Sequence, residues 1–264
     1  MKPRLLLTYS SGRSSGAMVD IILALYDHLF DIVILFANTG WEHEESLVFA
    51  DKCAKRWGNR VIWVEAKVNQ GRVACTFTRT TFEDASRNGE PLVEVVKKYG
   101  LPNAGYPHCT RELKENAIES YLRSIGWAKG SYLTCIGIRG DEPKRLKRGL
   151  CKSNGQVKVY PLADWFYMDK QMVFDYWKTV DFDLQIPDHL GNCVGCFRKS
   201  NKKLAMASTE EPEYFELAKS LEADFGHIGL NKIKGVHVAE PRMLYRGEIS
   251  AENLIASFNL EKVA

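Results

Sequence analysis

Hydrophobic runs of strand length alternate with helical patterns through the first quarter of the chain. Apolar runs cover residues 5–9, 31–38 and 61–66, and residues with helical spacing fill 17–29 and 42–57 between them. This order predicts a βαβαβ arrangement. Nearly continuous apolar strands with intervening helices are typical of a parallel sheet that is covered on both faces. We therefore expect an α/β fold, a Rossmann-like parallel sheet with helices on both faces.

The rest of the pattern predicts one more core strand and a set of helices. Residues 132–138 form a fourth apolar run, and residues 74–82 are rich in β-forming residues without a clear period. The tail beyond residue 222 is polar and indicates no element. We expect an α/β core over residues 1–165 and a helical C-terminal part over residues 166–264. The further helical patterns cover 90–99, 110–125, 169–179, 201–207 and 211–222.

The charge balance limits how nucleic acid could be bound. The chain has 264 residues, of which 45% are hydrophobic, and its 36 Lys and Arg against 33 Asp and Glu leave a net charge of +3. A polycation is excluded, so any contact with nucleic acid has to come from a local patch. The basic runs 144–152 and 198–203 are candidates, although such runs are more often solvated surface.

Targeting signals and cysteine content indicate an intracellular protein. No apolar run approaches the roughly 20 residues that a membrane span needs, and the N-terminus lacks the apolar segment of a signal peptide. Seven cysteines without the dense spacing of a secreted scaffold fit a reducing compartment. We expect a soluble cytoplasmic protein without membrane contact, whose thiols stay free or bind metal.

A Ser- and Gly-rich loop separates the first predicted strand from the first helix. Small residues let the backbone approach an anion, and free N–H groups at the start of a helix add partial positive charge. Arg13 adds a full charge, in a fork that fits phosphate oxygens. An ordinary strand-to-helix turn is the alternative. The expected phosphate contacts are Ser10, Ser11, Gly12, Arg13, Ser14 and Ser15.

Polar loops follow two further predicted strands, and ligands of open parallel sheets lie beyond the carboxyl ends of the strands. Thr39 and Gly40 follow the second strand. They are expected to form a second contact to the ligand of the Ser-rich loop, and the alternative is an ordinary turn and helix cap. The loop after the fourth strand contains arginines, which are suited to binding phosphate, and an acidic pair, which is suited to binding Mg²⁺. The alternative is that these residues only form surface salt bridges with one another. Its candidates are Arg139, Asp141, Glu142 and Arg145.

Three cysteines occupy positions typical of reactive or metal-bound thiols. Cys109 directly precedes a predicted helix, where a thiolate is favoured. Cys193 and Cys196 form a C-x-x-C motif, in which Gly195 gives the turn its freedom and two thiolates reach one metal ion or cluster. A redox dithiol and a structural coincidence remain alternatives. Cys53, inside a predicted helix, is expected to be buried and inert.

In this order the motifs resemble the phosphoadenosine phosphosulfate reductase family of the PP-loop ATP pyrophosphatase superfamily, which binds adenine nucleotides. The loop at residues 10–15 resembles the family's Ser-Gly-Gly-Lys-Asp-Ser, with Arg13 in place of Lys and Ser14 in place of Asp. Residues 39–42 resemble its Thr-Gly element, residues 109–114 its Cys-x-x-x-x-Lys segment, and residues 137–142 its Gly-Ile-Arg-x-Asp-Glu loop. The resemblance covers residues 5–205.

The resemblance also implies a cofactor. Iron–sulfur relatives bind a 4Fe–4S cluster through a Cys-Cys pair and a downstream C-x-x-C, which correspond here to Cys109 and to Cys193 with Cys196. Three protein thiolates would leave one iron free, as in some PP-loop tRNA thiolases. A fourth ligand could come from Cys135, His108 or His189. Zinc is the alternative metal.

Three functions follow from these residues. The first is an enzyme that binds ATP or an adenylylated sulfate, with Mg²⁺ where needed, and transfers or reduces sulfur with an iron–sulfur cluster and a reductant or sulfur-donor protein. The second is a phosphoadenylylsulfate reductase that uses a partner's thiol, and the absence of a cysteine after Cys196 weighs against it. The third is a non-catalytic nucleotide-binding or zinc-stapled module that contacts nucleic acid through its basic runs.

Overall fold

The computed structural model describes residues 2–150, 155–228, 241–246 and 249–261. Within them six strands form one sheet in the order β4-β3-β2-β1-β5-β6, in which only β4 is antiparallel to its neighbour. Leu7 at the centre of β1 pairs with Ile34 of β2 and with Cys135 of β5. The predicted α/β fold is confirmed. The strands are β1 (Arg4–Tyr9), β2 (Asp31–Asn38), β3 (Val61–Lys67), β4 (Thr76–Thr80), β5 (Leu133–Ile136) and β6 (Val157–Val159).

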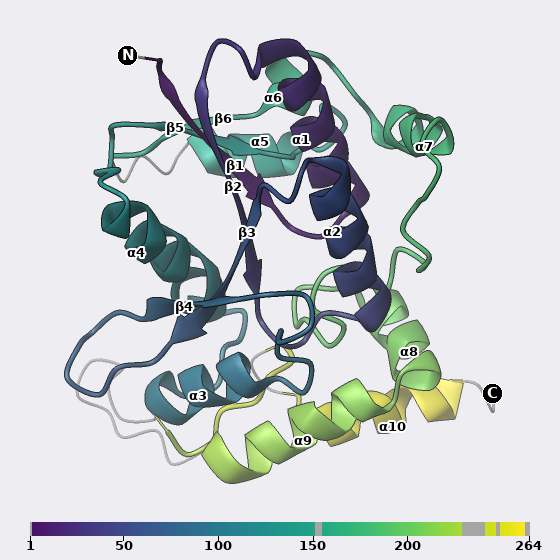
Figure 1. The fold of residues 1–264 in the computed structure, drawn as a ribbon. Coiled ribbons are helices and arrows are strands. Elements are labelled where there is room, and N and C mark those ends of the chain that lie inside the picture. The colour runs from purple at the N-terminus through teal and green to yellow at the C-terminus, as the bar shows by residue number, and fades with distance from the viewer. Residues whose placement is uncertain (1, 151–154, 229–240, 247–248, 262–264) are drawn as a thin grey trace.

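Helices cover both faces of this sheet. Figure 1 shows α1 and α2 on one face and α4 on the other, while α8, α9 and α10 gather beyond the end of β2. None of the helices in the described ranges is long and apolar enough to cross a membrane. The helices are α1 (Arg13–Tyr26), α2 (Glu44–Arg56), α3 (Glu90–Tyr99), the π-helical η1 (Thr110–Glu115), α4 (Asn116–Ser124), α5 (Pro143–Leu150), α6 (Pro161–Asp164), α7 (Lys170–Lys178), α8 (Asn201–Glu210), α9 (Glu213–Phe225) and α10 (Ala251–Glu261).

One expected helix differs in its winding, and one expectation about elements is wrong. The expected helix 110–125 is η1 followed by α4, so its first turns are wound as a π-helix. The tail beyond residue 222 was expected to hold no element, yet α10 forms there and buries Ala251, Leu254 and Phe258. Strand β6 and helices α5 and α6 were not expected either. The division of the chain at residue 165 stays a prediction.

Helix α7 packs against α1 and fixes the start of that helix. Trp177 is fully buried, donates its indole N–H to the carbonyl of Arg13 at 2.9 Å, and meets Phe49 of α2 edge to face. About two turns further along α1, Asp20 accepts hydrogen bonds from Arg56, Trp57 and Tyr176. Three helices far apart in sequence are therefore joined around the helix that begins at the Ser-rich loop.

Candidate functional site

The Ser-rich loop after β1 is held closed by its own hydroxyl groups. Ser15 Oγ donates to the carbonyl of Gly12 at 3.0 Å and accepts from the backbone N–H of Ser10 at 3.1 Å. Ser11 takes a left-handed conformation (φ 51°), which strains a residue other than glycine and is frequent at binding sites. Helix α1 starts without a side-chain cap and without an acidic residue in its first turn. Its N-terminus therefore suits an anion.

Arg13 has a carboxylate partner that the sequence did not indicate. Its Nε and Nη2 donate to the two carboxylate oxygens of Asp183 at 2.7 and 3.0 Å, and Nη2 also donates to the carbonyl of Leu184. The guanidinium stacks over Phe174, and only 15% of the side chain is exposed. Asp183 thus neutralises this charge and the segment after α7 covers it, and the expected contact of Arg13 with phosphate stays a prediction.

Glu42 organises the loop after β2. Its Oε2 accepts from the backbone N–H of Thr39 at 2.9 Å, from Thr39 Oγ1 at 2.7 Å and from the backbone N–H of Trp41 at 3.2 Å. Gly40 turns the chain with φ 75°, and a Cβ there would lie 2.9 Å from Cδ of Pro91. The carboxylate is almost fully buried. Thr39 is consequently fixed at the carboxyl end of β2.

The four charged candidates after β5 form one ion-pair network. Arg139 Nε donates to Asp141 at 2.8 Å, and Arg145 donates to Glu142 at 2.6 Å. Arg139 Nη1 also reaches Ser14 Oγ at 3.3 Å, so this loop touches the Ser-rich loop. Partial burial raises the pKa of Asp141 and the bond from Arg139 lowers it, with a net result below the usual value. Whether these residues hold phosphate or Mg²⁺ stays a prediction.

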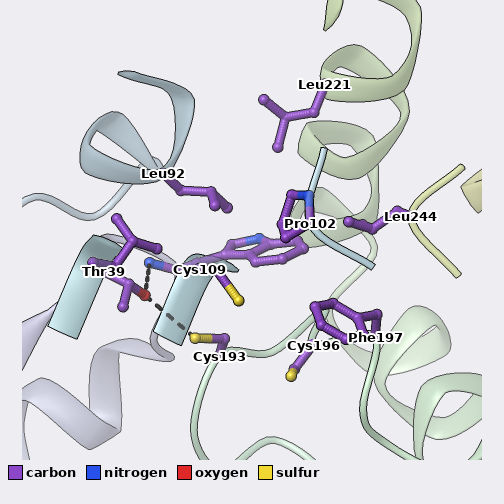
Figure 2. Close-up of a pocket in the computed structure, with 11 residues that line it drawn as sticks. Thr39, Leu92, Pro102, Cys109, Cys193, Cys196, Phe197, Leu221 and Leu244 are labelled. Atoms are coloured by element: carbon purple, nitrogen blue, oxygen red, sulfur yellow. Dashed lines mark hydrogen bonds between the residues drawn. The ribbon is translucent and has the colours of Figure 1, made fainter. Parts of the chain in front are cut away.

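Three cysteines from distant segments line one pocket beside Thr39. Cys109 comes from the start of η1, and Cys193 and Cys196 from the loop before α8 (Figure 2). Cys193 Sγ lies 3.3 Å from Thr39 Oγ1 and 3.7 Å from Glu42 Oε1. The pocket is otherwise mostly apolar. Its remaining lining residues are Trp41, Leu92, Pro102, Leu113, Phe197, Leu221 and Leu244.

Backbone contacts join the C-x-x-C loop to the loop after β2. Glu42 and Cys193 form an antiparallel bridge, and the N–H of Val194 donates to the carbonyl of Trp41 at 2.9 Å. Gly195 does not have the positive φ that would require glycine. A Cβ there would instead lie 2.4 Å from Cζ2 of Trp41, so glycine is needed for close packing and not for freedom of the turn.

The π-helical turn of η1 places Lys114 beside the thiols. Cys109 and Lys114 are five residues apart, and i→i+5 bonding brings such positions to one side of the helix, whereas an α-helix separates them. Lys114 Nζ lies 3.8 Å from Glu42 Oε1. Burial lowers the pKa of Lys114, but the thiolate form of Cys193, the carboxylate of Glu42 and the thiolate forms of Cys196 and Cys109 raise it more, so the ammonium form is favoured where these groups are ionised.

Burial favours the protonated form of Cys193 and of Cys109. It raises the pKa of Cys193 to about 12, with a contribution from the charge of Glu42, and it also raises the pKa of Cys109. The expectation that a helix start favours the thiolate of Cys109 is therefore wrong, since burial outweighs it. Cys53, away from the pocket, is fully buried with a pKa of about 12, as expected for an inert thiol.

The three thiols that line the pocket fit a metal that prefers sulfur, and a buried N–H donor that has no partner among the described residues lines the same pocket. That donor is Trp41 Nε1. In the described ranges, however, no three His, Cys, Asp or Glu side chains converge closely enough to hold a metal ion. The assignment of Cys109, Cys193 and Cys196 to a metal centre thus stays a prediction.

The three expected sources of a fourth ligand lie outside the lining of this pocket. Cys135 is fully buried in β5, and the Nε2 atom of His189 is bonded to Glu210 at 2.7 Å. His108 Nδ1 lies 3.1 Å from the carbonyl of Tyr106. None of the three is among the described residues that line the pocket with the thiols.

Lys199 changes the interpretation of the second basic run. Its ammonium donates to the carbonyls of His189 and Val194 and so supports the C-x-x-C loop. Burial lowers the pKa of Lys199 to about 8. This lysine is consequently a structural residue and not part of a solvated basic surface. In the first run, residue 152 lies outside the described residues.

The sequence alone did not indicate the roles of Trp41 and Lys199, and it indicated Lys114 only as part of the Cys-x-x-x-x-Lys motif. An α-helical interpretation of residues 110–125 places Lys114 and Cys109 on different sides of the helix, so helical spacing could not reveal that Lys114 lies beside Glu42 and the thiols. The Cys-x-x-x-x-Lys spacing itself was the available signal. No local pattern indicates that Trp41 packs on Gly195, because 153 residues separate them.

Comparison with known proteins finds relatives of this chain. The chain is 28% identical over 263 residues to the uncharacterized nin region protein ORF290 of Escherichia phage lambda, covering 96% of this chain and 84% of the relative. It is 23% identical over 177 residues to sulfate adenylyltransferase subunit 2 of Photobacterium profundum. This match covers 62% of this chain and 54% of the relative. The U34-tRNA thiolase NcsA from Methanococcus maripaludis, solved with its 4Fe–4S cluster, aligns with a TM-score of 0.44 and 13% identity over 91% of this chain and 79% of that chain.

A family model decides the assignment. The phosphoadenosine phosphosulfate reductase domain matches residues 4–197, which include the Ser-rich loop, the loop after β2, the Arg139 network and all three pocket cysteines. The resemblance seen in the motifs is thereby confirmed, and the chain belongs to the phosphoadenosine phosphosulfate reductase family.

Proposed function

We propose that this chain is an enzyme that binds an adenine nucleotide, either ATP or an adenylylated sulfate, and transfers or reduces sulfur with an iron–sulfur cluster held by Cys109, Cys193 and Cys196. The observation that carries the proposal is that these three thiols line one pocket together with Thr39. Thr39 lies at the carboxyl end of a central parallel strand, where ligands of such sheets bind.

The nucleotide end of the site is formed by loops at the ends of β1 and β5. The uncapped start of α1 offers backbone N–H groups to phosphate. Arg139 touches Ser14 and is the cation that we assign to the phosphates in place of Arg13. Its partner Asp141, with Glu142, would then be released to hold Mg²⁺.

The thiol end of the site combines sulfur ligands, one cation and an apolar lining. When bound, a cluster with three protein thiolates supplies sulfur and electron chemistry at the iron that no thiolate holds. Lys114 offsets the negative charge of the thiolates and of Glu42. Glu42 holds Thr39 against Cys193. Leu92, Leu113 and Phe197 exclude water, which strengthens these electrostatic contacts.

Iron content tests the cluster. We expect anaerobically purified protein to carry iron, sulfide and the broad visible absorbance of an iron–sulfur cluster. Cys193→Ser should lose most of the iron. Cys53→Ser is the matched control, since Cys53 is a buried thiol outside the pocket and its loss should leave the iron unchanged. Full iron in Cys193→Ser, or colourless wild-type protein that carries zinc, would contradict the proposal.

Nucleotide binding needs a separate measurement. Thermal shifts under anaerobic conditions with ATP, adenylylsulfate and phosphoadenylylsulfate identify the ligand, because a molecule that binds only the native state raises its stability. Arg139→Ala should then weaken the binding of that ligand by about 1.5–3 kcal/mol, the scale of a hydrogen bond to a charged group. Arg60→Ala, a surface arginine paired with Asp27, is the control. No shift with any of the three nucleotides would contradict the proposed nucleotide site.

A further inference from the structure

The indole N–H of Trp41 is a buried donor that has no partner among the described residues. Only 5% of Trp41 is exposed, and its Nε1 atom is inaccessible to solvent. Two other buried tryptophans do have partners: Nε1 of Trp57 donates to Asp20 at 2.8 Å and Nε1 of Trp177 to the carbonyl of Arg13 at 2.9 Å. Since buried N–H groups are nearly always bonded, the exception at Trp41 calls for an acceptor.

Trp41 cannot easily turn away to find an acceptor elsewhere. Its backbone N–H donates to Glu42 and its carbonyl accepts from Val194, so the main chain is bonded on both sides. The ring packs against Gly195, in the space that a side chain there would occupy. The indole is therefore fixed between the loop after β2 and the C-x-x-C loop.

The pocket that Trp41 lines limits which acceptor can reach the donor. Apart from the hydroxyl of Thr39, which bonds Glu42 and Cys193, the polar side chains that line it are the three thiols. A thiol is a weak acceptor, whereas thiolate and sulfide in an iron–sulfur cluster carry negative charge. A bound cluster would therefore bring the acceptor that the thiols do not supply.

We propose that Trp41 is a positioning and tuning residue that donates its Nε1–H to a sulfur atom of the cluster bound by Cys109, Cys193 and Cys196. This inference rests on the proposed function. A hydrogen bond to sulfur stabilises the more negative, reduced form of a cluster and thereby raises its reduction potential. The side chain is not a metal ligand, so its loss should alter the cluster without removing it.

The test compares variants that remove the N–H group and keep an aromatic ring. The two variants are Trp41→Phe and a protein with benzothienylalanine at position 41, whose ring has sulfur in place of the N–H. In both, the equilibrium constant for reduction of the cluster should become about tenfold less favourable. For a one-electron couple this equals a midpoint potential lower by about 59 mV. Redox titration of the loaded protein, followed by electron paramagnetic resonance, measures it. Trp63→Phe, a buried tryptophan of β3 outside the pocket, should leave the potential unchanged.

A second measurement needs no substitution. In wild-type protein labelled with ¹⁵N in the indole rings, the reduced cluster should show a hyperfine coupling to ¹⁵N, and Trp41 is the tryptophan among the lining residues. If the iron-loaded protein lacks this coupling, or if both Trp41 variants keep the wild-type potential, the inference about Trp41 is overturned while the proposed function stands. Wild-type protein that carries no iron would overturn the proposed function as well.

Discussion

Arg13 stabilises the fold through Asp183, and its removal should be felt in stability. We expect Arg13→Ala to lower the free energy of unfolding by about 1.5–3 kcal/mol, the scale of a hydrogen bond to a charged group, because the bidentate pair is mostly buried. Denaturant unfolding measures the change. Asp183→Asn should cause a similar loss, and the double variant should lose less than the sum of the two. Unchanged stability combined with weaker nucleotide binding would favour the phosphate contact instead.

Gly40 is needed both for its conformation and for the space around it. Gly58 shares the positive φ, but a Cβ added there would meet no atom within 4 Å, so it isolates the first effect. Gly58→Ala should destabilise the fold by about 1–2 kcal/mol through the left-handed conformation. Gly40→Ala should lose about 1–3 kcal/mol more, because its Cβ would meet Pro91 and Gly89. Equal losses in denaturant unfolding would show that the contact with Pro91 relaxes freely.

At the residue scale the sequence identifies which side chains carry chemistry but not which partner each one has. Cys109 and the C-x-x-C pair were expected to share a site, and they do line one pocket. Arg13 was assigned to phosphate because its partner Asp183 lies 170 residues further along the chain. Such a pairing follows from how α7 packs on α1, and no local pattern reports it.

At the scale of elements, Asp20 joins α1 to α2 and α7. Burial raises its pKa, and the bonds from Arg56, Tyr176 and Trp57 lower it more, so the folded value lies below the unfolded one. Its stabilisation is therefore present at neutral pH and is lost as the pH falls through the folded pKa, below about 4.

Asp20→Asn should accordingly lower the free energy of unfolding by about 1–3 kcal/mol at pH 7, and the difference from wild type should shrink at pH 3. Urea unfolding at the two pH values measures it. Asp175→Asn removes a carboxylate from an exposed pair with Lys178 and should change little at either pH. A deficit in Asp20→Asn that is equal at both pH values would contradict the electrostatic role.

Helices and strands were predicted correctly where the hydrophobic pattern was long, and most failures lie where this pattern was short or ambiguous. The apolar runs of β1, β2 and β3 gave the central sheet directly. Strand β6 has three residues, too few to show a period. The turns of η1 contain the same helix-forming residues as an α-helix, so composition could not reveal π winding. Helix α10 did carry a signal, since its buried residues 251, 254 and 258 follow helical spacing.

For the whole molecule, a bound cluster should act as a staple between the sheet and the C-terminal helices. Removal of the cluster with a chelator should lower the Tm by several degrees, since each kcal/mol corresponds to about 2–4 °C in a chain of this size. Differential scanning fluorimetry measures it. In Cys193→Ser, which we expect to hold little iron, the chelator should leave the Tm unchanged. A chelator-dependent drop of equal size in that variant would place the stabilising metal elsewhere.

The bridge between Glu42 and Cys193 joins segments of the chain that are synthesised far apart in time. Residues of β1, β2 and β3 leave the ribosome well before the C-x-x-C loop, and 83 residues lie between Cys109 and Cys193. During this interval Glu42 and Trp41 lack the loop against which they pack. Under the proposed function, cluster insertion is consequently a late event in the maturation of this chain, and a cell that is short of iron would accumulate a folded sheet whose pocket has closed on thiols alone.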